Sequence, residues 1–209
     1  MAIDTEALGL RERKRRRTRE AIARAALELF DRQGFHETTI PQIAAAADVS
    51  PRTVSGYFPH KEELAFPDSE EAFESLVRRL RERPAGEATA HALRAWIEAW
   101  LGAQAGRDEE LRMRRRVVER DERLRAYEHR FMLRAQDAIA EAIGRDLGVS
   151  AAELEPRMAA AATLTVFEVL GEVLEPAALS DRDALAVVDR ALLFIGAGIR
   201  ALDDRRPGG

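Results

Sequence analysis

TIPQIAAAADVSPRTVSGYF, residues 39–58, predicts two short helices separated by a tight break. Thr39 and Gln42 have the spacing of a capping box, in which the threonine accepts from the third helical amide and the glutamine reaches back. Apolar residues follow at helical spacing until the break near Asp48 and Val49. The first of the two helices is therefore expected to begin directly after Thr39.

Ser50 is expected to cap the second helix, with Pro51 at a first-turn position that needs no amide partner. The inward residues of this helix are Val54 and Phe58, four residues apart. The residues left on or near the outer face are Arg52, Thr53, Ser55, Gly56 and Tyr57. A short helix with a polar outer face, braced by a preceding helix, is what insertion into a major groove requires.

A longer helix precedes this pair. This helix is expected to end at Gly34. Its apolar residues recur at spacings of three and four, and they are Ile22, Ala25, Ala26, Leu29 and Phe30. The three helices together predict a small helical head with a helix-turn-helix.

Charge is distributed unevenly along the chain. The formal net charge is −4, yet residues 1–61 hold eleven Lys and Arg against eight Asp and Glu. Seven of these basic residues lie between Arg11 and Arg19. We interpret this run as an arm suited to phosphates or a minor groove, the alternative being a disordered, solubilising tail.

Beyond the head, helical periodicity continues without sustained apolar and polar alternation, so the fold is predicted to be all-α with about nine helices. We expect a helix from Lys61 that is kinked at Pro67 and continues to Arg83. Further helices are predicted over residues 88–104, from a cap at Asp108, and over 122–147, 151–174 and 181–202.

Several classes of function find no support in the residues. Cysteine is absent, and the four histidines have no metal-like spacing, so neither a metal nor another cofactor is expected. No phosphate loop, metalloprotease motif or nucleophile elbow occurs, which argues against an enzyme. The longest apolar stretch, Ala191–Ile199, is far shorter than the roughly 20 residues of a membrane span, which favours a cytoplasmic protein.

Residues 22–64 resemble the TetR family of bacterial transcriptional regulators. The resemblance lies in AALELFDRQGFHETTIPQIAAAADVS, residues 25–50, and PRTVSGYFPHKEEL, residues 51–64. It implies a DNA-binding domain over residues 1–61 and an effector-binding and dimerisation domain over residues 62–209.

The resemblance implies base-facing positions for Arg52 and Thr53, with Arg52 suited to a guanine edge, and phosphate contacts for Tyr57 and Lys61. With the hydroxyl residues near the helix starts and three arginines of the basic run, the expected DNA contacts are Thr39, Ser50, Arg52, Thr53, Ser55, Tyr57, Lys61, Arg15, Arg16 and Arg17. Solvated surface charges and ordinary structural roles are the alternative.

Two residues depart from the family pattern. Gly56 stands where a side chain is usual, so one DNA contact is expected to be missing. His60 stands where Ser or Asn commonly caps the next helix, which predicts a weaker cap.

Members of the family dimerise through their last two helices, and small residues in those segments here allow close approach. The expected interface residues are Ala161, Thr165, Val188, Leu192, Ile195 and Ile199. Packing within one chain is the alternative.

An apolar cavity for the effector is expected in the helical bundle, and its candidate lining is Trp96, Trp100, Met113, Phe131, Met132 and Phe167, with plain core packing as the alternative. Glu168 or Glu172 offers a polar anchor, unless both face solvent. The arginines at positions 112 and 114–116 suit an anionic head group or a solvated helix face.

The sequence thus predicts a ligand-responsive regulator, a repressor by the family's usual role, that binds double-stranded palindromic operator DNA as a homodimer and is released by a small apolar or amphipathic effector. The alternative is a helical protein-interaction module whose basic arm engages acidic partners without preferring any DNA sequence.

Overall fold

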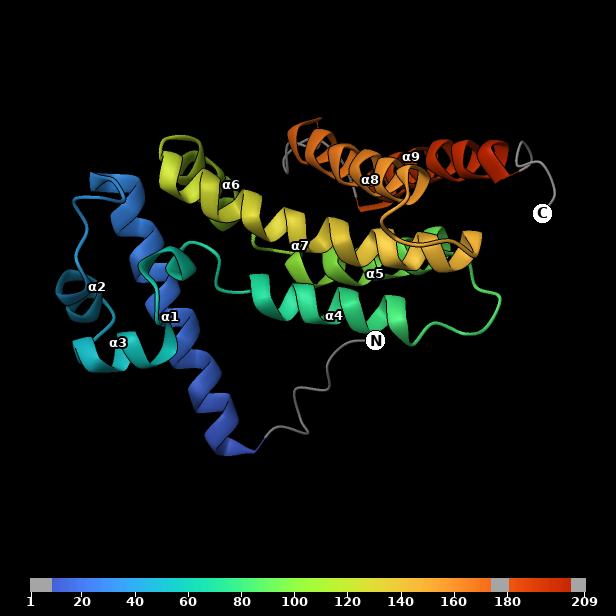
Figure 1. The fold of residues 1–209 in the computed structure, drawn as a ribbon. Helices are drawn as coiled ribbons and strands as arrows, with labels where there is room; N and C mark the ends of the chain where they lie inside the picture. Colours follow the sequence, from blue (N-terminus) through green and yellow to red (C-terminus); the bar gives the residue numbers. More distant parts are fainter. Residues whose placement is uncertain (1–8, 174–180, 204–209) are drawn as a thin grey trace. The chain divides into compact units, whose positions relative to one another are not determined.

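The computed structural model describes residues 9–173 and 181–203, and within these ranges every regular element is a helix. The helices are α1 (Leu10–Gln33), α2 (Ile40–Ala46), α3 (Pro51–Tyr57), the 3₁₀ turn η1 (Lys61–Leu64), α4 (Ser69–Arg81), α5 (Thr89–Gln104), α6 (Asp108–Glu119), α7 (Glu122–Leu147), α8 (Leu154–Val173) and α9 (Asp181–Asp203). The all-α prediction is confirmed (Figure 1).

The chain forms two compact units. Unit 1 contains the residues up to 70 together with 106–129, and unit 2 contains 71–105 and the residues from 130 onward. Unit 1 therefore combines the predicted DNA-binding head with α6 and the first turns of α7. The functional division between residues 61 and 62 remains a prediction, since packing and function need not divide a chain at the same residue.

The core of unit 1 is built on the apolar stripe of α1. Ile22 and Phe30 are buried in one cluster with Val54 of α3. Val117 and Val118 of α6 belong to the same cluster, because α6 packs along α1. Gly34 ends α1 with a φ of +90°, a conformation that glycine adopts without steric cost, as its position predicted.

The core of unit 2 joins α4, α5, α7, α8 and α9. Leu80, Leu93 and Ile139 are buried in it, and Ala160 of α8 and Val188 of α9 complete the cluster. Figure 1 shows α8 beside α9, and these two helices contact each other directly. None of the helices in the described part of the chain is both long and apolar enough to cross a membrane.

Some helix boundaries differ from the sequence-based expectation. The basic run lies inside α1 and is helical rather than an extended arm or a disordered tail, consistent with the high helix propensity of Arg and Lys. Asp108 is the first residue of α6 and not its cap, and the preceding Arg107 makes no side-chain cap bond. The helix expected from residue 151 begins at Leu154, after a turn in which the Ser150 amide donates to the Glu153 carboxylate over 3.3 Å.

Candidate nucleic-acid interface

The start of α2 is the predicted capping box. The Gln42 amide donates to the Thr39 hydroxyl over 3.4 Å, and the Thr39 amide donates to the Gln42 side-chain oxygen over 2.8 Å. The amides of Thr39 and Gln42 at this helix end therefore both have partners. Thr39 has a structural role here, and its predicted DNA contact stays a prediction.

The break between α2 and α3 is closed by local bonds. Asp48 adopts a φ of +52°, which aspartate tolerates better than most residues, and the Val49 amide donates to the Ala44 carbonyl. Ser50 then caps α3, because its hydroxyl accepts from the Thr53 amide over 3.0 Å. The predicted helix-turn-helix is thus present with its caps.

The two faces of α3 are chemically distinct. Val54 is fully buried, and Phe58 behind the helix end is buried too, so this face holds α3 to the head. Arg52 and Ser55 are exposed, and a Cβ added at Gly56 would meet no atom within 4 Å. The polar side of α3 therefore faces outward, as the spacing predicted.

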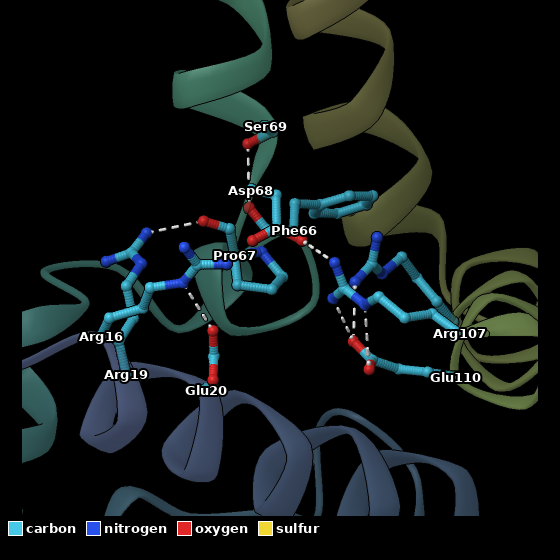
Figure 2. A network of polar contacts seen from close by, with 10 residues as sticks. Arg16, Arg19, Glu20, Phe66, Pro67, Asp68, Ser69, Arg107 and Glu110 are labelled. Carbon is cyan, nitrogen blue, oxygen red and sulfur yellow. Dashed lines mark hydrogen bonds and ion pairs between the residues drawn. The ribbon is translucent and has the colours of Figure 1, made fainter. Parts of the chain in front are cut away.

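Arg19 of α1 fixes the end of α3, a role that the sequence analysis missed. Its guanidinium donates to the Tyr57 carbonyl over 3.1 Å and to the Pro67 carbonyl over 2.7 Å, and it lies 4.4 Å from the centre of the Phe58 ring. Figure 2 shows Arg19 reaching the segment around Pro67. Its position three residues before Ile22, on the buried stripe of α1, is the signal that separates it from the other arginines of the run.

Lys61, predicted to contact phosphate, is engaged inside the head. Its Nζ donates to the Phe35 carbonyl over 2.5 Å and lies 4.4 Å from the centre of the Phe35 ring. Partial burial lowers the pKa of Lys61, although Glu62 opposes the effect. An ammonium has three donors, so one bond to Phe35 leaves two for phosphate. At His60, just before η1, no side-chain cap bond forms, which confirms the weaker cap.

The three predicted arginines of the basic run are exposed on the first turns of α1. Arg16 forms an ion pair with Glu20 one turn later, at 2.9 Å. Arg15 and Arg17 lie on either side of it in sequence, and a helix presents them at fixed angles, unlike an extended arm. Residues one and two apart on a helix do not face the same way, so these three arginines do not form a single surface, and their DNA contacts stay predictions.

Comparison with known proteins agrees with this arrangement. Residues 22–66 match the family described as bacterial regulatory proteins, tetR family. Over 207 residues the chain is 36% identical to the HTH-type transcriptional regulator TcmR of Streptomyces glaucescens, covering 96% of this chain and 92% of the relative. The chain belongs to the TetR family of bacterial transcriptional regulators.

Solved structures extend the likeness beyond the head. A complex of SmeT with triclosan has 25% sequence identity and a TM-score of 0.60, covering 85% of this chain and 90% of SmeT. The TetR-family repressor FadR of Thermus thermophilus, in complex with lauroyl-CoA, has 26% identity and a TM-score of 0.58, covering 91% of this chain and 100% of FadR. As in the rest of the TetR family, the helix-turn-helix is the DNA-binding element, and α3 is its second helix.

The residues predicted to line an effector cavity in this TetR-family chain are not all brought together. Trp96 and Trp100 stack on α5 with ring centres 6.4 Å apart, and Phe131 packs edge-on against Phe73. Met132 is exposed, whereas Met113 packs against the core of unit 1. The side chains of Phe167, Glu168 and Glu172 lie outside the described part of the structure.

The residues predicted for the dimer interface also differ in exposure, and one of them has a side chain outside the described part of the structure. Val188, Leu192 and Ile195 are buried within the chain, so their side chains are not open to a second copy. The large apolar side chains that are exposed on the described part of α9 are Leu193 and Phe194, which lie between the buried Leu192 and Ile195. Thr165 of α8 is exposed, Ala161 is half-buried, and the side chain of Ile199 is outside the described residues. Periodicity found the apolar stripe of α9 but could not show which neighbour it packs against.

Proposed function

We propose that this TetR-family regulator is a repressor that binds a palindromic operator as a homodimer and leaves it when a small apolar or amphipathic effector binds. The observation that carries the proposal is the outward face of α3, where Arg52 is exposed beside the capped helix start at Ser50. An arginine in this position suits the paired acceptors of a guanine edge in the major groove. Its target is bacterial operator DNA, so the protein is expected to act in the cytoplasm.

The homodimer is supported by large apolar side chains that remain exposed on the last two helices. Leu193 and Phe194 of α9 are 66% and 78% exposed, and Leu154 and Met158 of α8 are 68% and 57% exposed. Apolar side chains exposed on contacting helices favour burial against a partner. Two heads are also needed because one recognition helix covers too little DNA for high specificity.

The effector class is supported by the relatives. SmeT is known in complex with triclosan, and FadR of Thermus thermophilus in complex with lauroyl-CoA. One molecule is largely apolar and the other is amphipathic. Carried over to this chain, these complexes favour a ligand that buries an apolar body in the helical bundle.

The experiment is a selection of bound fragments from random duplex DNA by the purified full-length chain. A palindromic consensus should emerge, with half-sites about 34 Å apart or a multiple of that spacing. Fluorescence anisotropy on the selected duplex, with an unrelated duplex as competitor, then measures specificity at moderate salt. Failure to enrich any sequence would contradict the proposal and favour the protein-interaction module. Screening apolar and amphipathic compounds for release of the selected duplex tests the effector.

A further inference from the structure

The two ends of α3 are held in different ways. At the start, the Ser50 hydroxyl accepts from the Thr53 amide over 3.0 Å, so a neighbouring residue forms the cap. At the end, no left-handed residue turns the chain back, because Phe58 is extended with a φ of −135°. The Phe58 amide donates to the Val54 carbonyl over 2.9 Å, which leaves the later carbonyls of the helix to find partners outside it.

Arg19 of α1 supplies such a partner from a distant part of the chain. Its Nη1 donates over 3.1 Å to the carbonyl of Tyr57, the last residue of α3. The guanidinium also lies 4.4 Å from the centre of the Phe58 ring, so a hydrogen bond and a cation–π contact act on the same helix end. A positive charge is favourable at this place, because unpaired carbonyls leave partial negative charge at a helix C-terminus.

The guanidinium of Arg19 is itself anchored from a second side. Its Nη2 donates to the Pro67 carbonyl over 2.7 Å (Figure 2). Pro67 lies in a turn that the Ser69 hydroxyl closes by donating to the Phe66 carbonyl over 2.9 Å. Arg19 is therefore half-buried, with both terminal nitrogens donating to the main chain. The planar fork of arginine suits this geometry, whereas the compact ammonium of lysine does not reproduce it.

The helix that Arg19 holds has little stability of its own. It has seven residues, and Gly56, a poor helix former, lies in its second turn. A bidentate bond to a base edge depends on direction as well as distance, so it requires a helix held at a fixed angle in the groove. The contact at the end of α3 thus bears on how Arg52 is aimed from its start.

We propose that Arg19 is a positioning residue for operator recognition: without contacting DNA itself, it sets the angle at which α3 presents Arg52 and Thr53 to the major groove. The inference rests on the proposed operator-binding function and deepens it, because it makes specificity depend on a residue outside the helix-turn-helix. It also separates Arg19 from the exposed arginines of the same run, whose expected contacts are phosphates.

Arg19→Lys tests the proposal in the full-length protein, because it keeps the charge and removes the fork. Fluorescence anisotropy measures its affinity for the selected operator and for an unrelated duplex, at a temperature where circular dichroism shows the variant folded. Affinity for the operator should fall about tenfold, the size of one lost base contact, and affinity for the unrelated duplex should not change. A phosphate contact would survive the exchange, since lysine also binds phosphate.

Arg19→Gln, which removes the charge, completes the comparison. The slope of log affinity against log salt concentration on the unrelated duplex should equal that of the wild type, because no phosphate contact is lost. Arg24→Lys is the matched control, since Arg24 is exposed on the same helix, and it should behave as the wild type on both duplexes.

Amide hydrogen exchange gives a readout that needs no DNA. Exchange followed by mass spectrometry should be faster in residues 51–58 of Arg19→Lys than in the wild type, and unchanged in α2, residues 40–46. A general loss of stability would instead accelerate exchange in both segments alike. Arg24→Lys should leave both segments unchanged.

The inference is overturned if Arg19→Lys keeps the wild-type ratio of operator to unrelated-duplex affinity, or if exchange in residues 51–58 does not change. It is overturned as well if Arg19→Gln weakens both duplexes alike and lowers the salt slope by about one, the signature of a phosphate contact. If Arg19→Lys does not fold, Arg19→Gln carries the same measurements. A wild type without preference for any duplex contradicts the proposed function, and the exchange measurement still decides whether Arg19 holds the end of α3.

Discussion

Single residues of the same type have different roles in this chain, and their surroundings decide which. Arg52 is exposed on α3, Arg19 closes the end of the same helix, and Arg114 of α6 is half-buried beside Glu110. Lys61 makes an internal bond to the Phe35 carbonyl, and we propose that its remaining donors contact phosphate. Substitutions at these positions are expected to separate specificity, phosphate affinity and stability.

Arg52→Ala is expected to relax the base preference at one position in each half-site, because a bidentate contact to guanine contributes about 1–3 kcal/mol of discrimination. Anisotropy titrations against operators that differ at one base measure the effect. Arg81→Ala, which removes an exposed arginine of α4 that lies 3.8 Å from Glu141, is the control and should leave the preference intact. An equal loss on every duplex would show that Arg52 contacts only phosphate.

Lys61→Met is expected to weaken binding to all duplexes alike and to reduce the slope of log affinity against log salt concentration by about one. Anisotropy titrations at several salt concentrations measure both effects.

The stability of the same variant gives a second, independent prediction. The folded-state pKa of Lys61 is lowered, so between that pKa and 10.5 the unfolded chain binds more protons at this site. The free energy of unfolding of the wild type, relative to Lys61→Met, should therefore rise with pH through this window. Denaturant titrations at several alkaline pH values test it, and a pH-independent difference would contradict the buried position of the ammonium.

At the scale of elements, the segment between η1 and α4 is held from two sides. Arg19 of α1 donates to the carbonyl of Pro67, and Arg107 from the start of α6 donates to the carboxylate of Asp68 (Figure 2). The Ser69 hydroxyl closes the turn by donating to the Phe66 carbonyl over 2.9 Å. These bonds hold residues 66–69 against α1 and the start of α6 within unit 1.

Asp68→Asn should lower the free energy of unfolding by about 1 kcal/mol, a modest loss because the pair is partly solvated and Arg107 keeps Glu110. Urea denaturation followed by circular dichroism measures it. The matched control is Asp137→Asn, the same change at an exposed position of α7, for which no loss is expected. Equal stabilities for the two variants would mean that the bond to Arg107 holds nothing in place.

For the whole molecule, the exposed apolar residues of α8 and α9 point to assembly. Val188, Leu192 and Ile195 are already buried inside the chain, so Leu193 and Phe194 are the large apolar residues of α9 that we propose contact a second copy. A dimer would also supply the second recognition helix that the proposed operator specificity requires, because Pro51–Tyr57 alone is short.

Phe194→Glu should convert a dimer to monomers, because a charge would have to be buried in the proposed apolar interface. Analytical ultracentrifugation should show a halved mass, and affinity for the palindrome should fall toward that for a single half-site. Leu133→Glu makes the same kind of change at an exposed position of α7 and should stay dimeric. A dimeric Phe194→Glu protein would place the interface elsewhere.

Features that depend on neighbouring residues could be predicted from the amino-acid sequence: the capping box at Thr39, the Ser50 cap, the end of α1 at Gly34 and the outward side of α3. These follow from spacings of three and four within one turn of helix. Only the tertiary structure shows what the internal arginines contact. Arg19 meets Tyr57 across 38 residues and Arg107 meets Asp68 across 39, so neighbouring residues do not reveal these partners, although the place of Arg19 on the stripe of Ile22 marks it as facing inward. The same limit applies to α9, where periodicity marks an apolar stripe, and only packing against the other helices shows that the stripe is already buried.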